Sequence, residues 1–162
     1  MKAISELRES LNVEFKWNKS RMDCFVKMLL GLFTVRTVNL SEIAVCFRSG
    51  AQKASRYRRL QRFFAYFKVD FCVLARWIFH LFLSEKSTFY LAMDRTNWYF
   101  GKQKINVLML SALYEGIAIP LLWTLLPKAG NSCGKEQIEL LTGFVNLFGK
   151  SCIAGVLGDR EF

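Results

Sequence analysis

Several features on which common enzyme classes depend are scarce or absent in this chain of 162 residues. The single histidine, His80, lies in an apolar run that predicts a core position, which leaves a Cys-His or Ser-His nucleophile without a base. The five cysteines are odd in number and form no Cys-x-x-Cys pair, so a disulfide framework and a zinc site are disfavoured and a reducing cytoplasm is favoured. Gly-rich phosphate-binding loops are also absent.

A long uncharged hydrophobic run is missing as well. Residues 1–20 carry three glutamates and no long apolar run, which excludes a secretory signal. Residues 107–127 are mostly apolar, but Glu115-Gly116 interrupts them, and a carboxylate near the bilayer centre costs about 2.5–3.5 kcal/mol. Two buried strands joined by a turn explain these residues without that cost. We therefore expect a cytoplasmic protein with no membrane partner.

Acidic residues are in the minority. The chain has 23 Lys and Arg against 13 Asp and Glu, a formal net charge of +10. Residues 1–90 contribute 16 − 7 = +9, and residues 91–162 contribute 7 − 6 = +1. A basic excess confined to one part of the chain points to a polyanion such as nucleic acid or an anionic membrane. Because 52% of the residues are hydrophobic, the chain can also form a packed core.

Residues 1–87 are expected to form a helical, basic, DNA-binding region. Ser41 is a suitable N-cap for a short helix over 42–47, and a Ser-Gly break separates it from a helix over 52–67. A buried helix is expected over 71–83. On the helix over 52–67, one face is predicted to be apolar and the opposite face basic: Tyr57, Leu60, Phe63, Phe64 and Phe67 against Arg58, Arg59 and Arg62.

Residues 88–162 predict an α+β or α/β domain in the order strand, strand, strand, helix, strand. A first strand over 89–93 stops at Asp94, and two strands over 106–114 and 117–125 form a hairpin. An amphipathic helix is expected over 135–148 and a last strand over 152–157. The apolar face of that helix is predicted from five positions: Ile138, Leu141, Phe144, Val145 and Phe148.

Asp94 and Asp159 each follow a predicted strand directly. The crossover through the helix makes the fourth strand parallel to the first and its neighbour, so both aspartates are expected at the same sheet edge. Two adjacent carboxylates repel one another unless a proton or a divalent cation separates them, and hard oxygen ligands select Mg²⁺ or Mn²⁺. The alternative is that each aspartate only begins a turn or caps a helix.

The segments MDRTNW (93–98) and GVLGDREF (155–162) resemble the DDE transposases of bacterial insertion sequences, which have a ribonuclease-H-like catalytic core. The segments VNLSEIA (38–44) and SRYRRLQRFF (55–64) resemble the N-terminal DNA-binding part of the same group. The resemblance covers about residues 38–162 and includes the two aspartate motifs and the basic helix in the family's order.

The resemblance implies that Asp94 and Asp159 are catalytic residues that bind Mg²⁺ (or Mn²⁺) for DNA cleavage and strand transfer. It also implies double-stranded DNA as partner (terminal repeats and target), a homo-oligomer on DNA, and a bacterial, nucleoid-associated protein. The family's third carboxylate, a Glu in a Tyr-Arg-Glu-Lys signature, has no counterpart here, and Glu161 is too close to Asp159 to replace it. We therefore expect the front part of an incomplete core, inactive by itself.

The basic helix predicts a DNA interface. Residues 47–68 contain seven basic and no acidic side chains. The candidate DNA-binding residues are Arg48, Lys53, Arg56, Arg58, Arg59 and Arg62. A short helix, a break and a longer basic helix fit a helix-turn-helix reader, whose arginines contact phosphate as readily as guanine. The alternative is a solvated basic face on a core helix.

Two interpretations stay open for each of three further residues. Trp98 packs beside the site or against DNA, but burial is favoured. Arg95 and Arg160 either offset carboxylate charge or lie on the solvated surface. For the whole chain, two alternatives to an active transposase stay open. One is a catalytically dead DNA-binding remnant that inhibits intact transposase, and the other is a membrane protein.

Overall fold

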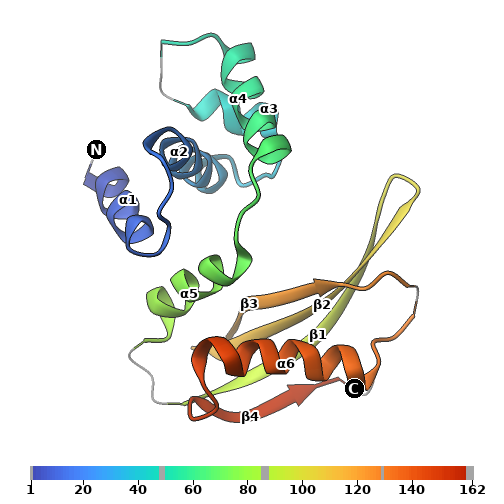
Figure 1. Ribbon diagram of the computed structural model, residues 1–162. Coiled ribbons are helices and arrows are strands. Elements are labelled where there is room, and N and C mark those ends of the chain that lie inside the picture. Colours follow the sequence, from blue (N-terminus) through green and yellow to red (C-terminus); the bar gives the residue numbers. More distant parts are fainter. Residues whose placement is uncertain (1, 48–49, 85–87, 129, 160–162) are drawn as a thin grey trace. The chain divides into compact units, whose positions relative to one another are not determined.

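The computed structural model describes residues 2–47, 50–84, 88–128 and 130–159 (Figure 1). Residue contacts divide the chain into two compact units, Met1–Asp70 and Phe71–Phe162. The expected boundary at residues 87 and 88 lies one helix later. The helix α5 (Phe71–Phe82) joins the second unit because Ala75 and the adjacent Leu83 are buried in the same core as the strands.

The first unit is helical, as expected. Its elements are α1 (Lys2–Glu14), α2 (Lys19–Val35), α3 (Leu40–Ile43), the 3₁₀ helix η1 (Ala44–Cys46) and α4 (Lys53–Tyr66). The helix α2 is central and contacts all the others. Gly31 allows α3 to approach it closely, because a Cβ there would lie 3.0 Å from Ile43 Cγ2. An aromatic cluster closes one end of the unit: Phe15, Trp17, Phe25, Phe63 and Phe67.

Asparagines, rather than serine, cap the helices of this unit. The Oδ1 atom of Asn18 accepts a hydrogen bond from the Arg21 amide at 2.9 Å, which begins α2. Asn39 Oδ1 accepts from the Ser41 amide at 3.0 Å, so the N-cap of α3 lies two residues before the predicted Ser41. Asn and Ser both satisfy free helix amides, and the chain enters the helix at the earlier of the two.

The helix α4 nearly matches its predicted range, since Gln52 and Phe67 flank it as caps. Its apolar face is narrower than predicted. Leu60 and Phe63 are buried, but Phe64 is mostly exposed. A helix that packs on one side against α2 and η1 buries a stripe, and Phe64 lies at the margin of that stripe.

The second unit carries a four-stranded mixed sheet of order β3-β2-β1-β4. Its strands are β1 (Phe89–Phe100), β2 (Gln103–Tyr114), β3 (Ile117–Leu125) and β4 (Ile153–Gly158), with α6 (Gly134–Phe148) before β4. The predicted hairpin at Glu115-Gly116 is confirmed, as is the parallel pairing of the first and last strands. The α+β class is thereby confirmed.

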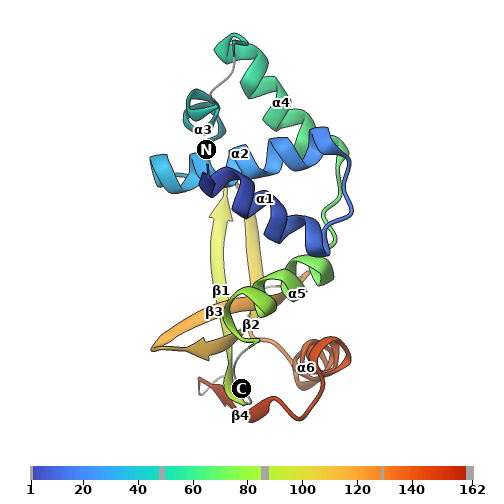
Figure 2. The ribbon, with the colours of Figure 1, turned by 90° about the vertical axis from the view of Figure 1, so that its left-hand side faces the viewer.

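The helices α5 and α6 pack on the same face of the sheet (Figure 2). Alternate residues of β1, such as Leu91 and Met93, point into this core and meet Leu140 and Phe144 of α6. Ile138, which was predicted on the buried face of α6, is exposed, because Leu140 rather than Ile138 faces the strands.

The helix α5 is less buried than its composition predicts. Among its described side chains only Ala75 is fully enclosed, whereas Phe71 and Leu81 are about half exposed. His80 is exposed near the end of the helix, so the prediction of a core histidine is wrong. A helix that covers one face of a sheet buries only the stripe that touches it.

The largest departure is the length of β1. The predicted strand ends at Asp94, but β1 continues to Phe100 and turns at Gly101 into β2. Residues 97–100 pair with residues 103–106, where β1 and β2 have passed the ends of β3 and β4. We call residues 97–106 the arm; it extends as a two-stranded ribbon beyond the rest of the sheet (Figures 1 and 2).

Within the described residues, no single helix is both long and apolar enough to cross a membrane. The pair formed by α2 with α3 and η1 meets that test together, with a bend of 107° at the break.

Candidate functional site

Asp94 lies within β1, and Asp159 directly follows the last residue of the neighbouring strand β4. The parallel register pairs Met93 of β1 with Gly158 of β4, so its next step brings Asp94 opposite Asp159. Neighbouring strands lie about 4.8 Å apart, and residues paired in register share a face. The predicted juxtaposition therefore follows from the register, although Asp94 lies within β1 and not after its end.

Both aspartates are exposed. Asp94 alternates with the buried Met93, so it lies on the sheet face opposite α5 and α6. Its Oδ1 accepts a hydrogen bond of 2.7 Å from the Arg95 amide. Two exposed carboxylates whose positions follow from an extended register would form an oxygen-rich donor set that suits a hard divalent cation.

The strand β4 approaches β1 closely on this same face. Gly155 pairs with Tyr90, and a Cβ at position 155 would stand 2.8 Å from Tyr90 Cε1. The glycine therefore lets the Tyr90 ring lie across β4. This contact adjusts the register four residues before Asp159.

Arg95 does not lie beside the carboxylates. It pairs with the buried Leu108 on the opposite face, and its Nη2 donates to Asn131 Oδ1 at 3.2 Å. The suggested role of Arg95 in offsetting the aspartate charge is therefore not supported. Arg160 and Glu161 lie outside the described residues. Among residues that the structure does describe, no three His, Cys, Asp or Glu side chains gather as a metal site.

The basic residues of α4 divide into two groups. Lys53, Arg58 and Arg62 are exposed. Arg56 and Arg59 turn inward: Arg56 Nη1 donates to Phe47 O at 2.5 Å, and Arg59 Nη2 donates to Ser20 O at 2.8 Å. The latter two arginines hold α4 against the rest of the unit. Arg48, the sixth predicted DNA contact, lies outside the described residues.

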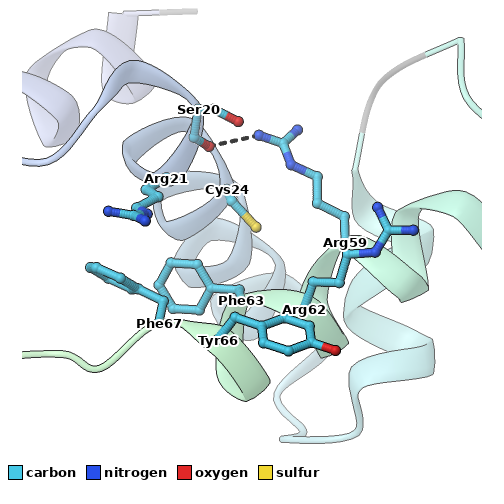
Figure 3. A pocket seen from close by; sticks show the side chains of 8 residues that line it. All are labelled: Ser20, Arg21, Cys24, Arg59, Arg62, Phe63, Tyr66 and Phe67. Atoms are coloured by element: carbon cyan, nitrogen blue, oxygen red, sulfur yellow. Dashed lines mark hydrogen bonds between the residues drawn. The ribbon is translucent and has the colours of Figure 1, made fainter.

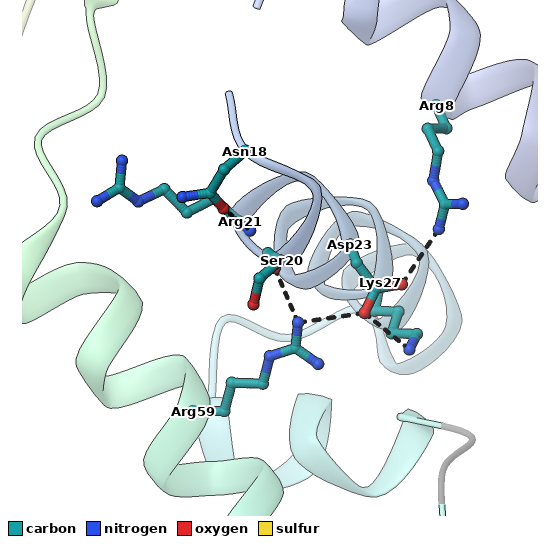
Figure 4. A network of polar contacts seen from close by, with 7 residues as sticks. All are labelled: Arg8, Asn18, Ser20, Arg21, Asp23, Lys27 and Arg59. Carbon is teal, nitrogen blue, oxygen red and sulfur yellow. Dashed lines mark hydrogen bonds and ion pairs between the residues drawn. The ribbon is translucent and has the colours of Figure 1, made fainter. Parts of the chain in front are cut away.

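Asp23 is the centre of a cationic network on α2 (Figure 4). Its carboxylate accepts from Lys27 Nζ at 2.9 Å, from Arg8 Nη2 at 3.1 Å and from Arg59 Nη2 at 3.1 Å. Burial opposes ionisation of this carboxyl, but hydrogen bonding and charge from Lys27 and Arg59 outweigh it, so the pKa of Asp23 lies below its ordinary value. One carboxylate thus ties together α1, α2 and α4.

A shallow hollow of about 200 Å³ lies between α2 and α4 (Figure 3). It combines three arginines with aromatic rings: Arg21, Arg59, Arg62, Phe63, Tyr66 and Phe67, together with Ser20 and Cys24. The Arg21 guanidinium stacks 4.7 Å from the centre of the Phe67 ring. Burial raises the pKa of the Cys24 thiol, which therefore stays protonated and unreactive at neutral pH.

Cations with exposed aromatic rings are the surface chemistry that nucleic acids recognise, through phosphate and through base stacking. Sequence reasoning found Arg62 but missed Arg21 and Tyr66. Arg21 belongs to a different helix, so no pattern within α4 could reveal it. Tyr66 is largely exposed, although it stands next to the buried stripe in sequence.

Comparisons of this chain with protein-family models, with curated proteins and with solved structures found no match. The resemblance of its motifs to transposases therefore stays a prediction.

Proposed function

We propose that this chain acts in DNA transposition as part of a DDE transposase, binding transposon-end DNA through its helical unit and reacting at Asp94 and Asp159. One observation carries the proposal. Two strands predicted from sequence to lead to a carboxylate at a common edge are parallel neighbours, and one further step beyond their last pair, Met93 and Gly158, would set Asp94 opposite Asp159. Two aspartates that served only to begin turns would not need to follow neighbouring parallel strands at matching positions.

We further propose that the sheet is the beginning of a ribonuclease-H-like core. Support comes from the element order, in which an antiparallel meander of three strands is followed by a helix and a fourth strand parallel to the first. The open face that bears Asp94 leaves room for a duplex to approach. A buried pair could not reach a phosphodiester.

In this proposal the carboxylate oxygens of Asp94 and Asp159 hold Mg²⁺ or Mn²⁺. The ion supplies charge neutralisation and activation of an attacking oxygen, water in cleavage and a DNA 3′-hydroxyl in strand transfer. Asp94 is anchored by the Arg95 amide, which limits the directions its other oxygen can take.

The helical unit supplies the affinity for DNA. Arg58 and Arg62 of α4 are exposed and free of acidic neighbours within their helix, whereas Arg59 is held by Asp23. Phosphate contacts by such side chains release counterions, so the affinity falls as salt rises. The hollow beside Arg62 adds aromatic rings for contacts with sugars or bases.

A salt titration tests the DNA-binding part. The affinity of a fluorescein-labelled 30-base-pair duplex is measured by fluorescence anisotropy between about 50 and 200 mM KCl. We expect a steep loss for the wild type, and a log–log slope shallower by about 2 for Arg58→Ala/Arg62→Ala. The matched control Lys135→Ala/Lys150→Ala, in the second unit, should leave the slope nearly unchanged. Binding that ignores salt, or no binding, contradicts the proposal.

A second candidate is a DNA-binding protein that occupies transposon ends without cutting them and so inhibits an intact transposase. It is favoured by the absence of a third carboxylate beside Asp94 and Asp159 in the described part of the chain. A two-carboxylate site holds its metal weakly. We expect the 162 residues to compete with an intact transposase for end DNA without turnover. Mg²⁺-dependent cleavage that Asp94→Asn abolishes would reject this candidate in favour of the first.

A further inference from the structure

The arm, residues 97–106, is a ribbon with exposed aromatic residues, and it is anchored at its base by the buried Asn106. Trp98, which the sequence favoured as a buried residue, is 56% exposed, and Tyr99 is 67% exposed. The two rings leave opposite faces of the ribbon, because successive strand residues alternate. A two-stranded ribbon is only marginally stable in water, so large rings on its surface favour a partner that covers them.

Trp98 shares a face with Asp94. The two residues are four positions apart on β1, which corresponds to about 13 Å along the strand. Ile105 pairs with Trp98 and widens the apolar platform on that face. Stacked nucleotides are spaced by about 3.4 Å, so a strand whose phosphate lies at Asp94 would place a base roughly four steps away against Trp98.

The positive charge of the arm indicates which kind of partner would be attracted to it. Residues 95–114 carry three basic side chains, Arg95, Lys102 and Lys104, and no acidic one. Lys104 pairs with Tyr99 on the ribbon, and Lys102 is exposed beside the turn glycine. Two copies of this arm would repel each other, whereas a polyanion is attracted. A two-stranded ribbon also has the width that the major groove of DNA admits.

We propose that the arm is a second DNA-binding element, in which Trp98 stacks on an unpaired base of the strand that reaches Asp94 and Asp159, and Lys102 at the turn contacts a neighbouring phosphate. This inference rests on the proposed function, since it takes DNA as the substrate of the same site. It assigns Trp98 as a positioning residue that fixes the reacting strand on the sheet.

The test compares two duplexes of equal length, one blunt and one with a four-nucleotide 3′ overhang, by anisotropy at one salt concentration. The wild type is expected to prefer the overhang. Trp98→Ala should reduce overhang affinity by about fivefold to a hundredfold, the range for losing one base–aromatic stack, and leave blunt-duplex affinity nearly unchanged. Trp98→Phe should restore much of the preference. Ile117→Ala, at the far end of the sheet, is the matched control for an exposed apolar residue.

Lys102 is tested separately. Lys102→Ala should weaken binding to both duplexes and reduce the salt slope by about 1. A wild type that binds both duplexes in a salt-dependent way but shows no overhang preference overturns the arm proposal alone. Retention of that preference by Trp98→Ala also overturns it. A wild type that binds neither duplex overturns the proposed function and the arm with it. Circular dichroism of each variant verifies that the sheet is intact.

Discussion

At the residue scale, the direction in which a side chain leaves its helix decides whether it can reach DNA. Arg59 and Arg62 are three positions apart on α4. Both line the hollow, but Arg59 donates hydrogen bonds to Ser20 O and Asp23, whereas Arg62 is exposed. The first stabilises the unit, and the second offers a cation to a phosphate. A substitution at Arg59 therefore changes stability as well as affinity.

The Asp23 network gives a prediction about stability and pH. We expect Asp23→Asn to lower the free energy of unfolding at pH 7 by about 1–3 kcal/mol, because a partly buried carboxylate with three cations is lost. The pKa of Asp23 in the folded state lies below its ordinary value of 3.8, so its stabilising effect is present above that value and disappears as pH falls through the folded pKa.

Urea unfolding of both proteins, followed by circular dichroism from pH 7 downward, measures this effect. The difference between wild type and Asp23→Asn should shrink toward acid pH. Glu9→Gln, an exposed carboxylate on α1, is the control and should change little. A difference that is independent of pH would contradict the ionised network.

Gly155 gives a second residue-scale prediction. Gly155→Ala should destabilise the protein by about 1–3 kcal/mol, because its methyl group would collide with the Tyr90 ring. Gly134→Ala, where no atom lies within 4 Å of the added Cβ, should be harmless. The double variant Tyr90→Ala/Gly155→Ala should recover part of the loss in a thermodynamic cycle. Additive effects of the two substitutions would show that the ring and the glycine are not in contact.

At the scale of elements, local patterns predicted most of the secondary structure but not where β1 ends. The alternation in β2, the Glu115-Gly116 turn and the apolar period of α6 are local signals, and each element formed where expected. The continuation of β1 to Phe100 depends on pairing with residues 103–106 across Gly101. That pairing is a local hairpin across Gly101. The sequence nevertheless predicts a strand end at Asp94, because the short apolar run over 89–93 stops there.

For the candidate site, the sequence could predict only which strands are neighbours in the sheet. The crossover rule predicts that the strands before Asp94 and Asp159 are parallel neighbours, which the pairing of β1 with β4 confirms as far as Met93 and Gly158. The roles of Arg56 and Arg59 could not be predicted, since a helical wheel shows spacing but not the carbonyls of Phe47 and Ser20 that receive them. The sequence favours burial of Trp98 because a large aromatic side chain buries much apolar area, but the extension of β1 exposes it.

The β2–β3 turn gives a prediction at this scale. Glu115 has φ of 47° and Gly116 has φ of 81°, and the left-handed region is unfavourable for Glu but tolerated by Asn. Glu115→Asn should therefore raise the free energy of unfolding by about 0.5–1 kcal/mol. Lys102→Asn, in the other hairpin turn at a position without positive φ, is the control and should give no gain. Equal effects of the two substitutions in urea unfolding would contradict the turn assignment.

At the scale of the whole molecule, charge and candidate chemistry lie in different units. Residues 1–70 carry 14 − 6 = +8, and residues 71–162 carry 9 − 7 = +2. In the proposed function, the helical unit supplies general attraction to DNA, while the sheet-bearing unit offers the aspartates and a small local excess of lysine on the arm. Separate units for affinity and for chemistry allow each to be tested without disabling the other.

The central claim is that Asp94 and Asp159 together hold a divalent cation. The direct measurement is Mn²⁺ binding to the 162-residue chain, followed by loss of the free-ion signal in electron paramagnetic resonance. Asp94→Asn and Asp159→Asn should each weaken binding at least about tenfold, since even the loss of a residue that only supports a ligand costs that much. The double variant should bind Mn²⁺ no more weakly than the single variant with the lower Mn²⁺ affinity. Glu115→Gln should bind Mn²⁺ as the wild type does. Equal Mn²⁺ affinity in wild type and both single variants would contradict the claim.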